Sequence, residues 1–186
     1  MTNSKSKTDV IMAGLGGMGV LLAGKLLAGA ALEKFKYVSW LPSYGVEKRG
    51  GVCECTIIFS DNEISSPLLD LAQTVVIFDG SQFSTFEDRV KAGGIMLIDS
   101  AKMKDEPTRN DYTLIKIPAV ETAHKKEDSK ISNLILLGAY IGATESLPPE
   151  FVQASVSESL GKNESIKEKN KAALQLGIEL GASGIK

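Results

Sequence analysis

The fold is decided by the stretch Val10-Ile11-Met12-Ala13-Gly14-Leu15-Gly16-Gly17-Met18-Gly19. Four consecutive apolar residues end at a glycine cluster, a pattern typical of a parallel strand that is buried on both faces. Apolar residues then recur at helical spacing over residues 18–32. A strand, a glycine turn and a helix therefore open an α/β fold.

The rest of the chain continues to alternate strands with helices. Further strands are predicted at residues 37–40, 52–60, 74–78, 94–99 and 112–117, with a polar helical stretch at 84–91. A helix between two such strands indicates a right-handed βαβ crossover. Three helices are predicted to close the chain, beginning near residues 131, 147 and 164. The first is apolar nearly all round, which predicts burial in this core or against a partner.

Composition limits the class of protein. The 186 residues, 43% hydrophobic and 24% charged, are expected to form one domain over residues 1–186, with residues 1–8 as a flexible tail. A formal charge of -2, from 21 basic and 23 acidic residues in mixed order, argues against a nucleic-acid partner. The tail does not resemble a secretory signal, and the longest apolar run, residues 134–143, is too short to span a membrane. We therefore expect a cytoplasmic protein with no membrane partner.

The residues with redox or metal-binding chemistry are few. Cys53 and Cys55 lie in a predicted strand and are expected to be reduced thiols. Two thiols cannot supply the four thiolates of an iron–sulfur cluster, and the single His124 adds little. We expect no metal on this chain, so that an electron carrier would belong to another chain.

The glycine turn is the first candidate site. Gly14, Gly16, Gly17 and Gly19 form a G-x-G-x-x-G pattern between a predicted strand and a predicted helix. Backbone amides at such a helix start can bind a phosphate or another anion. A dinucleotide site also needs a carboxylate at the end of the second strand, but Trp40 is followed there by Leu41-Pro42, which weakens a nicotinamide site. The alternative is that the glycines serve only close packing of the helix on the sheet.

Residues 41–51 form the second candidate site and are predicted to be a loop. Ligands of open α/β sheets lie outside the carboxyl ends of the strands, so this loop should lie beside the glycine turn. Its proline, three glycines, tyrosine and guanidinium suit recognition of a ligand or a partner surface. A solvated loop with an unused Arg49 is the alternative.

Other polar residues offer less. Asn133, at the start of the apolar helix, is predicted to cap it, with hydrogen bonding between loops as the alternative. The spacing of Asp79, Asp99 and His124 does not select them as an acid–base set, because each aspartate simply ends a strand. Nucleophile-elbow and P-loop patterns are absent from the sequence, so no catalytic residue is predicted.

At these residues the sequence resembles the gamma subunits of 2-oxoacid:ferredoxin oxidoreductases and the matching domain of pyruvate:ferredoxin oxidoreductases. The resemblance is carried by the glycine turn running into Val20-Leu21-Leu22-Ala23-Gly24, by residues 41–51, and by Asn133 with Leu137-Gly138-Ala139. It extends along nearly the whole chain. It implies a Rossmann-like three-layer α/β/α sandwich with a mostly parallel sheet and C-terminal helices.

The resemblance also implies a multi-subunit enzyme. The chain would join alpha and beta subunits, and in some enzymes a ferredoxin-like delta subunit, and would be inactive alone. Thiamine diphosphate, magnesium, iron–sulfur clusters and coenzyme A would act on or with the other subunits, converting a 2-oxo acid to its acyl-coenzyme A. A free-standing nucleotide-binding oxidoreductase and a purely architectural subunit are the alternative functions.

The implied binding residues can be carried over one by one. The matching positions are Gly14, Gly16, Gly17, Gly19, Pro42, Ser43, Tyr44, Gly45, Glu47, Arg49, Gly50 and Asn133. The coenzyme A diphosphate would suit the glycine turn and Arg49. Val46, Lys48 and Met18 depart from the family pattern, which affects the substrate assignment. The form of the loop favours 2-oxoglutarate enzymes, with branched-chain 2-oxo acid enzymes as the alternative.

Overall fold

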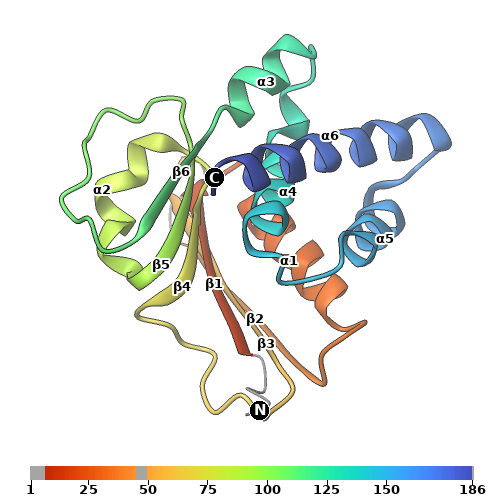
Figure 1. The fold of residues 1–186 in the computed structure, drawn as a ribbon. Helices are drawn as coiled ribbons and strands as arrows, with labels where there is room; N and C mark the ends of the chain where they lie inside the picture. The colour runs from red at the N-terminus through yellow and green to blue at the C-terminus, as the bar shows by residue number, and fades with distance from the viewer. Residues whose placement is uncertain (1–6, 45–49, 186) are drawn as a thin grey trace.

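A computed structural model describes residues 7–44 and 50–185 (Figure 1). Its strands are β1 (Lys7–Leu15), β2 (Tyr37–Tyr44), β3 (Val52–Ser60), β4 (Ala72–Ile77), β5 (Val90–Asp99) and β6 (Thr113–Ile117). Its α-helices are α1 (Val20–Ala31), α2 (Phe83–Phe86), α3 (Ala119–Lys125), α4 (Ser132–Thr144), α5 (Pro149–Leu160) and α6 (Glu164–Ser183). Short 3-10 turns are η1 (Gly80–Gln82), η2 (Glu87–Arg89) and η3 (Ser129–Ile131).

The strands form one mixed sheet in the order β2-β3-β1-β4-β5-β6. β3 pairs antiparallel with both β1 and β2, whereas β1 with β4, β4 with β5, and β5 with β6 pair parallel. Five strands therefore point the same way and only β3 is reversed. The predicted mostly parallel sheet is confirmed.

Helices cover both faces of the sheet and make three layers. In Figure 1 the layer of α1, α4, α5 and α6 lies on one side and α2 lies on the other. Within β1, Val10 and Met12 join the hydrophobic cluster under the large helical layer, and Ile11 and Ala13 join the cluster that contains Phe83. All four β1 residues are fully buried, which explains the continuous apolar run, since each face of the strand needs its own apolar side chains.

The apolar helix α4 is buried in the core of this chain, one of the two predicted possibilities. It packs closely on α6. A Cβ atom on Gly138 would collide with the carbonyl oxygen of Leu174, and one on Gly177 would collide with the carbonyl oxygen of Ile135. Glycine on both helices therefore allows their backbones to touch, so α4 is enclosed without needing a partner.

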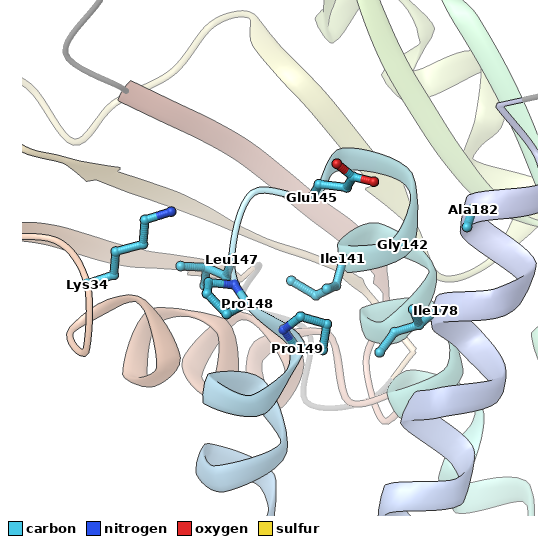
Figure 2. Close-up of a pocket in the computed structure, with 9 residues that line it drawn as sticks. All are labelled: Lys34, Ile141, Gly142, Glu145, Leu147, Pro148, Pro149, Ile178 and Ala182. Carbon is cyan, nitrogen blue, oxygen red and sulfur yellow. The ribbon is translucent and has the colours of Figure 1, made fainter. Parts of the chain in front are cut away.

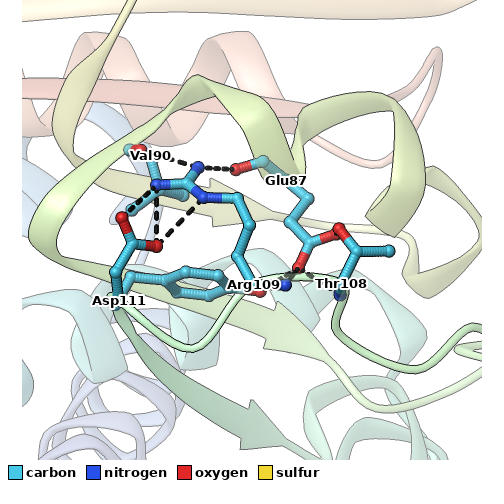
Figure 3. Close-up of polar contacts among 6 residues, drawn as sticks. Glu87, Val90, Thr108, Arg109 and Asp111 are labelled. Atoms are coloured by element: carbon cyan, nitrogen blue, oxygen red, sulfur yellow. Dashed lines mark hydrogen bonds and ion pairs between the residues drawn. The ribbon is translucent and has the colours of Figure 1, made fainter.

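The connection between β5 and β6 is held against η2 by Glu87 (Figure 3). The Glu87 carboxylate accepts hydrogen bonds from the Thr108 N–H (2.8 Å), the Thr108 hydroxyl (2.7 Å) and the Tyr112 hydroxyl (2.9 Å). Arg109 donates to the Glu87 carbonyl oxygen (3.0 Å) and pairs with Asp111 (2.9 Å). Burial would raise the pKa of Glu87, but these hydrogen bonds together lower it, so the carboxylate is held in its ionised form.

Several predicted boundaries are wrong. Residues 41–44 belong to β2 rather than to a loop, because β3 pairs with β2 as far as Tyr44 opposite Cys53. The predicted helix at 84–91 shrinks to α2 with flanking 3-10 turns, and residues 90 and 91 already belong to β5. The short helix α3 was missed. Lys7 and Thr8, predicted as tail, start β1, and residues 1–6 lie outside the described part of the chain.

Within the described residues, no helix combines the length and the apolar character that crossing a membrane requires.

Candidate functional site

The glycine turn lies where the connections of the sheet change direction. From β1 the chain passes through α1 to β2 on one side of the sheet, whereas β4, β5 and β6 lie on the other side. Ligands of open α/β sheets bind at such a point, outside the carboxyl ends of the strands. That edge is at the top of Figure 1, where α3 also lies.

Gly14 fits the alternative in which glycine serves close packing of the helix on the sheet. The Phe78 N–H donates to the Ala13 carbonyl oxygen at 2.8 Å, which brings the ends of β1 and β4 together. A Cβ atom on Gly14 would lie 2.9 Å from the Phe78 Cβ and 3.1 Å from Val20. Gly14 is also buried, so its role is to let the two strand ends and α1 meet.

Gly17 and Gly19 shape an open backbone surface. Both have positive φ angles, 95° and 78°, which L side chains rarely adopt. Gly17 is exposed, and a Cβ atom there would meet nothing within 4 Å. Gly19 is the N-cap of α1, where no side chain caps the helix. The first N–H groups of α1 therefore lack a side-chain acceptor, as an anion-binding helix start requires.

The predicted position of residues 41–51 beside the glycine turn is confirmed where the structure describes them. The Gly16 N–H donates to the Gly51 carbonyl oxygen at 2.9 Å, and Gly50 has a φ angle of 78°. Pro42 and Ser43 sit in the last part of β2, the edge strand of the sheet. The side chain of Tyr44 and the predicted site residues Gly45, Glu47 and Arg49 lie outside the described residues.

Asn133 does not cap α4, so the predicted capping role is wrong. The N-cap of α4 is Ile131, and no side chain caps this helix. Asn133 is only 6% exposed, and its amide lies so close to Gly19 that a Cβ atom there would collide with it. Its Oδ1 atom is buried without a hydrogen-bond partner in the described structure. Asn133 therefore brings α4 against the glycine turn and leaves a buried acceptor there.

These elements enclose a pocket of about 510 Å³, which we call the glycine-turn pocket. One wall comes from the glycine turn and α1, and the other comes from α3, η3 and the start of α4. The lining residues are Gly17, Met18, Gly19, Leu22, Val120, His124, Ser129, Lys130, Ser132 and Asn133.

Sequence reasoning missed most of the second wall of this pocket. Lys130 and Ser132 flank Ile131 directly before Asn133, so their place beside an already selected residue was the available signal. His124, treated as structural in the sequence, is exposed and lines the pocket. The glycine turn therefore faces two side chains that can carry positive charge.

Charge around the second wall favours an anion. Asp128 is paired with Lys169 at 3.0 Å, and this hydrogen bond lowers the Asp128 pKa. Lys125 is paired with Glu121. Lys130 has no ion pair among the described residues and is exposed. The Asp128 carboxylate interacts with its ammonium group only through space and is held by Lys169 instead.

Asp79 and Asp99 serve turn structure, as predicted. Asp79 accepts from the Ser81 N–H (3.0 Å) and pairs with Lys102 (2.9 Å). Burial would raise the Asp79 pKa, but hydrogen bonds from Ser81 and Lys102 lower it overall. Asp99 accepts from the backbone N–H groups of Ala101 (2.9 Å) and Val120 (2.7 Å), while burial raises its pKa. Both carboxylates are occupied by the backbone or by a lysine.

The predicted reduced cysteines are confirmed, since Cys53 and Cys55 are both free and buried. Burial raises the pKa of Cys55 to about 12. Both thiols are therefore poor ligands and poor nucleophiles at neutral pH. The described residues contain no group of three His, Cys, Asp or Glu side chains that could hold a metal ion.

A second pocket, of about 400 Å³, lies at the other end of α4 (Figure 2). Ile141, Leu147 and Ile178 give it a largely apolar lining, and Lys34 and Glu145 are its charged side chains. It lies away from the glycine turn and suits an apolar group rather than a phosphate. The glycine-turn pocket is therefore the candidate functional site.

Comparison with known proteins agrees with the resemblance noted in the sequence. Residues 9–180 match the family "Pyruvate ferredoxin/flavodoxin oxidoreductase". The 2-oxoglutarate synthase subunit KorC of Methanocaldococcus jannaschii is 30% identical over 179 residues, covering 95% of this chain and 95% of the relative. The ketoisovalerate oxidoreductase subunit VorA of Methanothermobacter thermautotrophicus is 32% identical over 172 residues, but this chain spans only 35% of its length.

Solved structures share the fold. The gamma subunit of a keto/oxoacid ferredoxin oxidoreductase from Geobacter sulfurreducens superposes with a TM-score of 0.81 at 25% identity, covering 95% of this chain and 99% of that one. The 2-oxoglutarate:ferredoxin oxidoreductase of Magnetococcus marinus gives a TM-score of 0.87 at 21% identity, covering 97% of this chain and 32% of that one. The predicted three-layer α/β fold is thus confirmed, and the chain belongs to the pyruvate ferredoxin/flavodoxin oxidoreductase family.

Proposed function

We propose that this chain is the gamma subunit of a 2-oxoacid:ferredoxin oxidoreductase and that its glycine-turn pocket encloses the diphosphate of coenzyme A. Family membership and the full-length match to a KorC subunit support the subunit assignment. The Magnetococcus marinus relative of the same fold was solved with coenzyme A and succinyl-coenzyme A bound. The pocket supports the ligand assignment on its own chemistry.

The observation that carries the proposal is the start of α1. This 12-residue helix begins at a glycine turn with no side-chain cap, and the turn lines a pocket together with Lys130, which makes no ion pair among the described residues. Backbone N–H groups and the helix dipole favour a phosphate at such a place.

The sheet order weighs against the free-standing nucleotide-binding oxidoreductase. In a dinucleotide site, the strand next to β1 ends in the carboxylate that binds the ribose. Here the neighbour of β1 is the antiparallel strand β3, which begins rather than ends at that edge. The end of β2, one strand farther away, carries Ser43 and Tyr44 instead of a carboxylate.

The substrate of the proposed complex is 2-oxoglutarate, which it would convert to succinyl-coenzyme A. Full-length matches to KorC subunits support this choice, and the partial match to VorA makes 2-oxoisovalerate the alternative. In this proposal the chain supplies no catalytic residue. Thiamine diphosphate, magnesium and iron–sulfur clusters belong to alpha, beta and delta partners in the cytoplasm, in keeping with the buried neutral thiols found here.

The test is to co-express the chain with alpha and beta partners and to measure coenzyme-A-dependent reduction of an artificial electron acceptor. 2-Oxoglutarate, pyruvate and 2-oxoisovalerate are compared as substrates. We expect activity that requires this chain and is highest with 2-oxoglutarate. A stable alpha–beta complex that is equally active without this chain would leave it an architectural role and refute the proposal.

A further inference from the structure

We infer that Lys130 binds a phosphate of the ligand in the glycine-turn pocket and that Asn133 accepts a hydrogen bond from an N–H or O–H group of the same ligand. This assignment rests on the proposed function, because it takes coenzyme A as the occupant. It also defines the class of ligand, which must combine a phosphate with a nearby neutral hydrogen-bond donor.

Hydrogen bonds to Asp128 fix the backbone at Lys130 and at the next residue. It belongs to η3, the turn that leads directly into α4. The Lys130 N–H donates to the Asp128 carboxylate at 3.2 Å, and the Ile131 N–H donates to the Asp128 carbonyl oxygen at 3.3 Å. The side chain of Ile131 is 5% exposed and anchors the turn in the core. Lys130 therefore lines the pocket, together with Gly17 and Gly19, from a backbone position that these hydrogen bonds fix.

The charge of Lys130 is available to a ligand. Asp128, the N-cap of η3, pairs with Lys169 and interacts with the Lys130 ammonium group only through space, so Lys130 makes no ion pair within the described chain. The other titratable side chain in the lining is His124. A lysine ammonium and an uncapped helix start that line the same pocket are a suitable pair of groups for a phosphate, since both favour negative charge nearby.

Asn133 adds a second and independent requirement. Its Oδ1 atom is a buried acceptor without a partner in the described structure, and the residue is only 6% exposed. Buried acceptors are normally satisfied, and a phosphate oxygen cannot donate a hydrogen bond to one. An occupant that carries a hydrogen-bond donor of its own would satisfy this acceptor. The pantetheine arm of coenzyme A carries amide N–H and hydroxyl groups next to its diphosphate, whereas inorganic pyrophosphate lacks such an arm.

The test uses the reconstituted complex, with the KM for coenzyme A as the readout. We expect Lys130→Ala to raise this KM about tenfold, the loss of roughly one charged hydrogen bond, with the effect on KM rather than on kcat. Lys130→Arg should recover most of the affinity because the charge remains. Added salt should weaken binding less in Lys130→Ala than in the unaltered complex. Lys126→Ala removes an equal charge from a nearby exposed residue outside the pocket lining and is the control.

The full chain alone supplies the second measurement, by calorimetric titration with coenzyme A and with inorganic pyrophosphate. We expect Lys130→Ala to weaken both ligands and Asn133→Ala to weaken only coenzyme A, with circular dichroism confirming that the variants are folded. A coenzyme A KM and salt dependence unchanged by Lys130→Ala, in a complex that requires this chain, would overturn the assignment and leave the proposed function standing. Activity that does not require the chain would instead refute the proposed function.

Discussion

Replacing Gly19 by alanine tests the contact between the glycine turn and α4, and Gly17→Ala is the matched control. Both residues have positive φ angles, 78° and 95°, so each substitution carries a backbone cost of about 1–2 kcal/mol. A Cβ atom at Gly17 would meet nothing within 4 Å, whereas one at Gly19 would collide with the Asn133 amide. Overpacking of this kind costs about 1–3 kcal/mol.

We therefore expect Gly19→Ala to destabilise the full chain by about 2 kcal/mol more than Gly17→Ala, which corresponds to a difference of about 4–8 °C in Tm for a chain of this size. Urea denaturation followed by circular dichroism measures the difference, provided that the m-value is unchanged. Adding Asn133→Ala to Gly19→Ala should recover part of the loss, since it removes the colliding amide. Equal destabilisation by the two glycine variants would refute the contact.

Three further results are expected. Glu87→Gln should cost about 1–3 kcal/mol at pH 7. Hydrogen bonds lower the pKa of Glu87 in the folded chain, so the ionised carboxylate stabilises the fold above the ordinary pKa range of glutamate. This stabilisation is lost as the pH falls through the lower folded-state pKa. Urea denaturation between pH 7 and 3 should therefore show a smaller acid-induced fall in the free energy of unfolding for the variant than for the unaltered chain. Cys55 should resist iodoacetamide at pH 8 in the folded chain and react in urea, as read by mass spectrometry, because burial raises its pKa to about 12; rapid labelling of the folded chain would contradict its burial. Gly177→Ala should lower stability by about 1–3 kcal/mol through collision with the Ile135 carbonyl oxygen. Gly29→Ala, at an exposed position of α1 where a Cβ atom would approach only the Ser155 hydroxyl at 3.1 Å, should cost less; equal melting temperatures would argue against the close contact of α4 with α6.

The opening strand and turn could be predicted because their signals are local. A continuous apolar run needs burial on both faces, and the two hydrophobic clusters divide Val10 and Met12 from Ile11 and Ala13 as that requires. The strand at residues 52–60 was predicted with its observed bounds, since β-branched residues fill it and Asp61-Asn62 ends it. The local sequence pattern was sufficient to predict an element where its structure did not depend on which distant segment packs against it.

Features that depend on distant partners could not be predicted. Pro42 and Gly45 indicated a loop, but β2 continues through Pro42 because β3 pairs with it and because its other side is an edge of the sheet. Asn133 looked like a cap from its position near a helix start. Its actual neighbour is Gly19, far away in the sequence, and only the packing of α4 against the glycine turn brings them together.

The candidate site was predicted in part for the same reason. The glycine motif and Asn133 stood out by residue type, and the structure places both at one pocket. Lys130 has no distinguishing pattern, because a lysine in a polar turn is ordinarily a solvated surface residue. Its place opposite the glycine turn follows from the fold of α3 and η3, which the sequence did not reveal.

The reversed strand β3 has a consequence for how such a subunit can diverge. Because β2 ends and β3 begins at the edge where β1 also ends, the chain connects two neighbouring antiparallel strands at that edge, where Gly50 lies beside Gly16. A crossover helix between these strands would pack on the sheet, so substitutions in it would disturb a whole helical layer. A hairpin tip can instead change its residues or its length while the strands keep their register. Substitutions in the connection between β2 and β3 can therefore change a candidate binding segment while the sheet is kept.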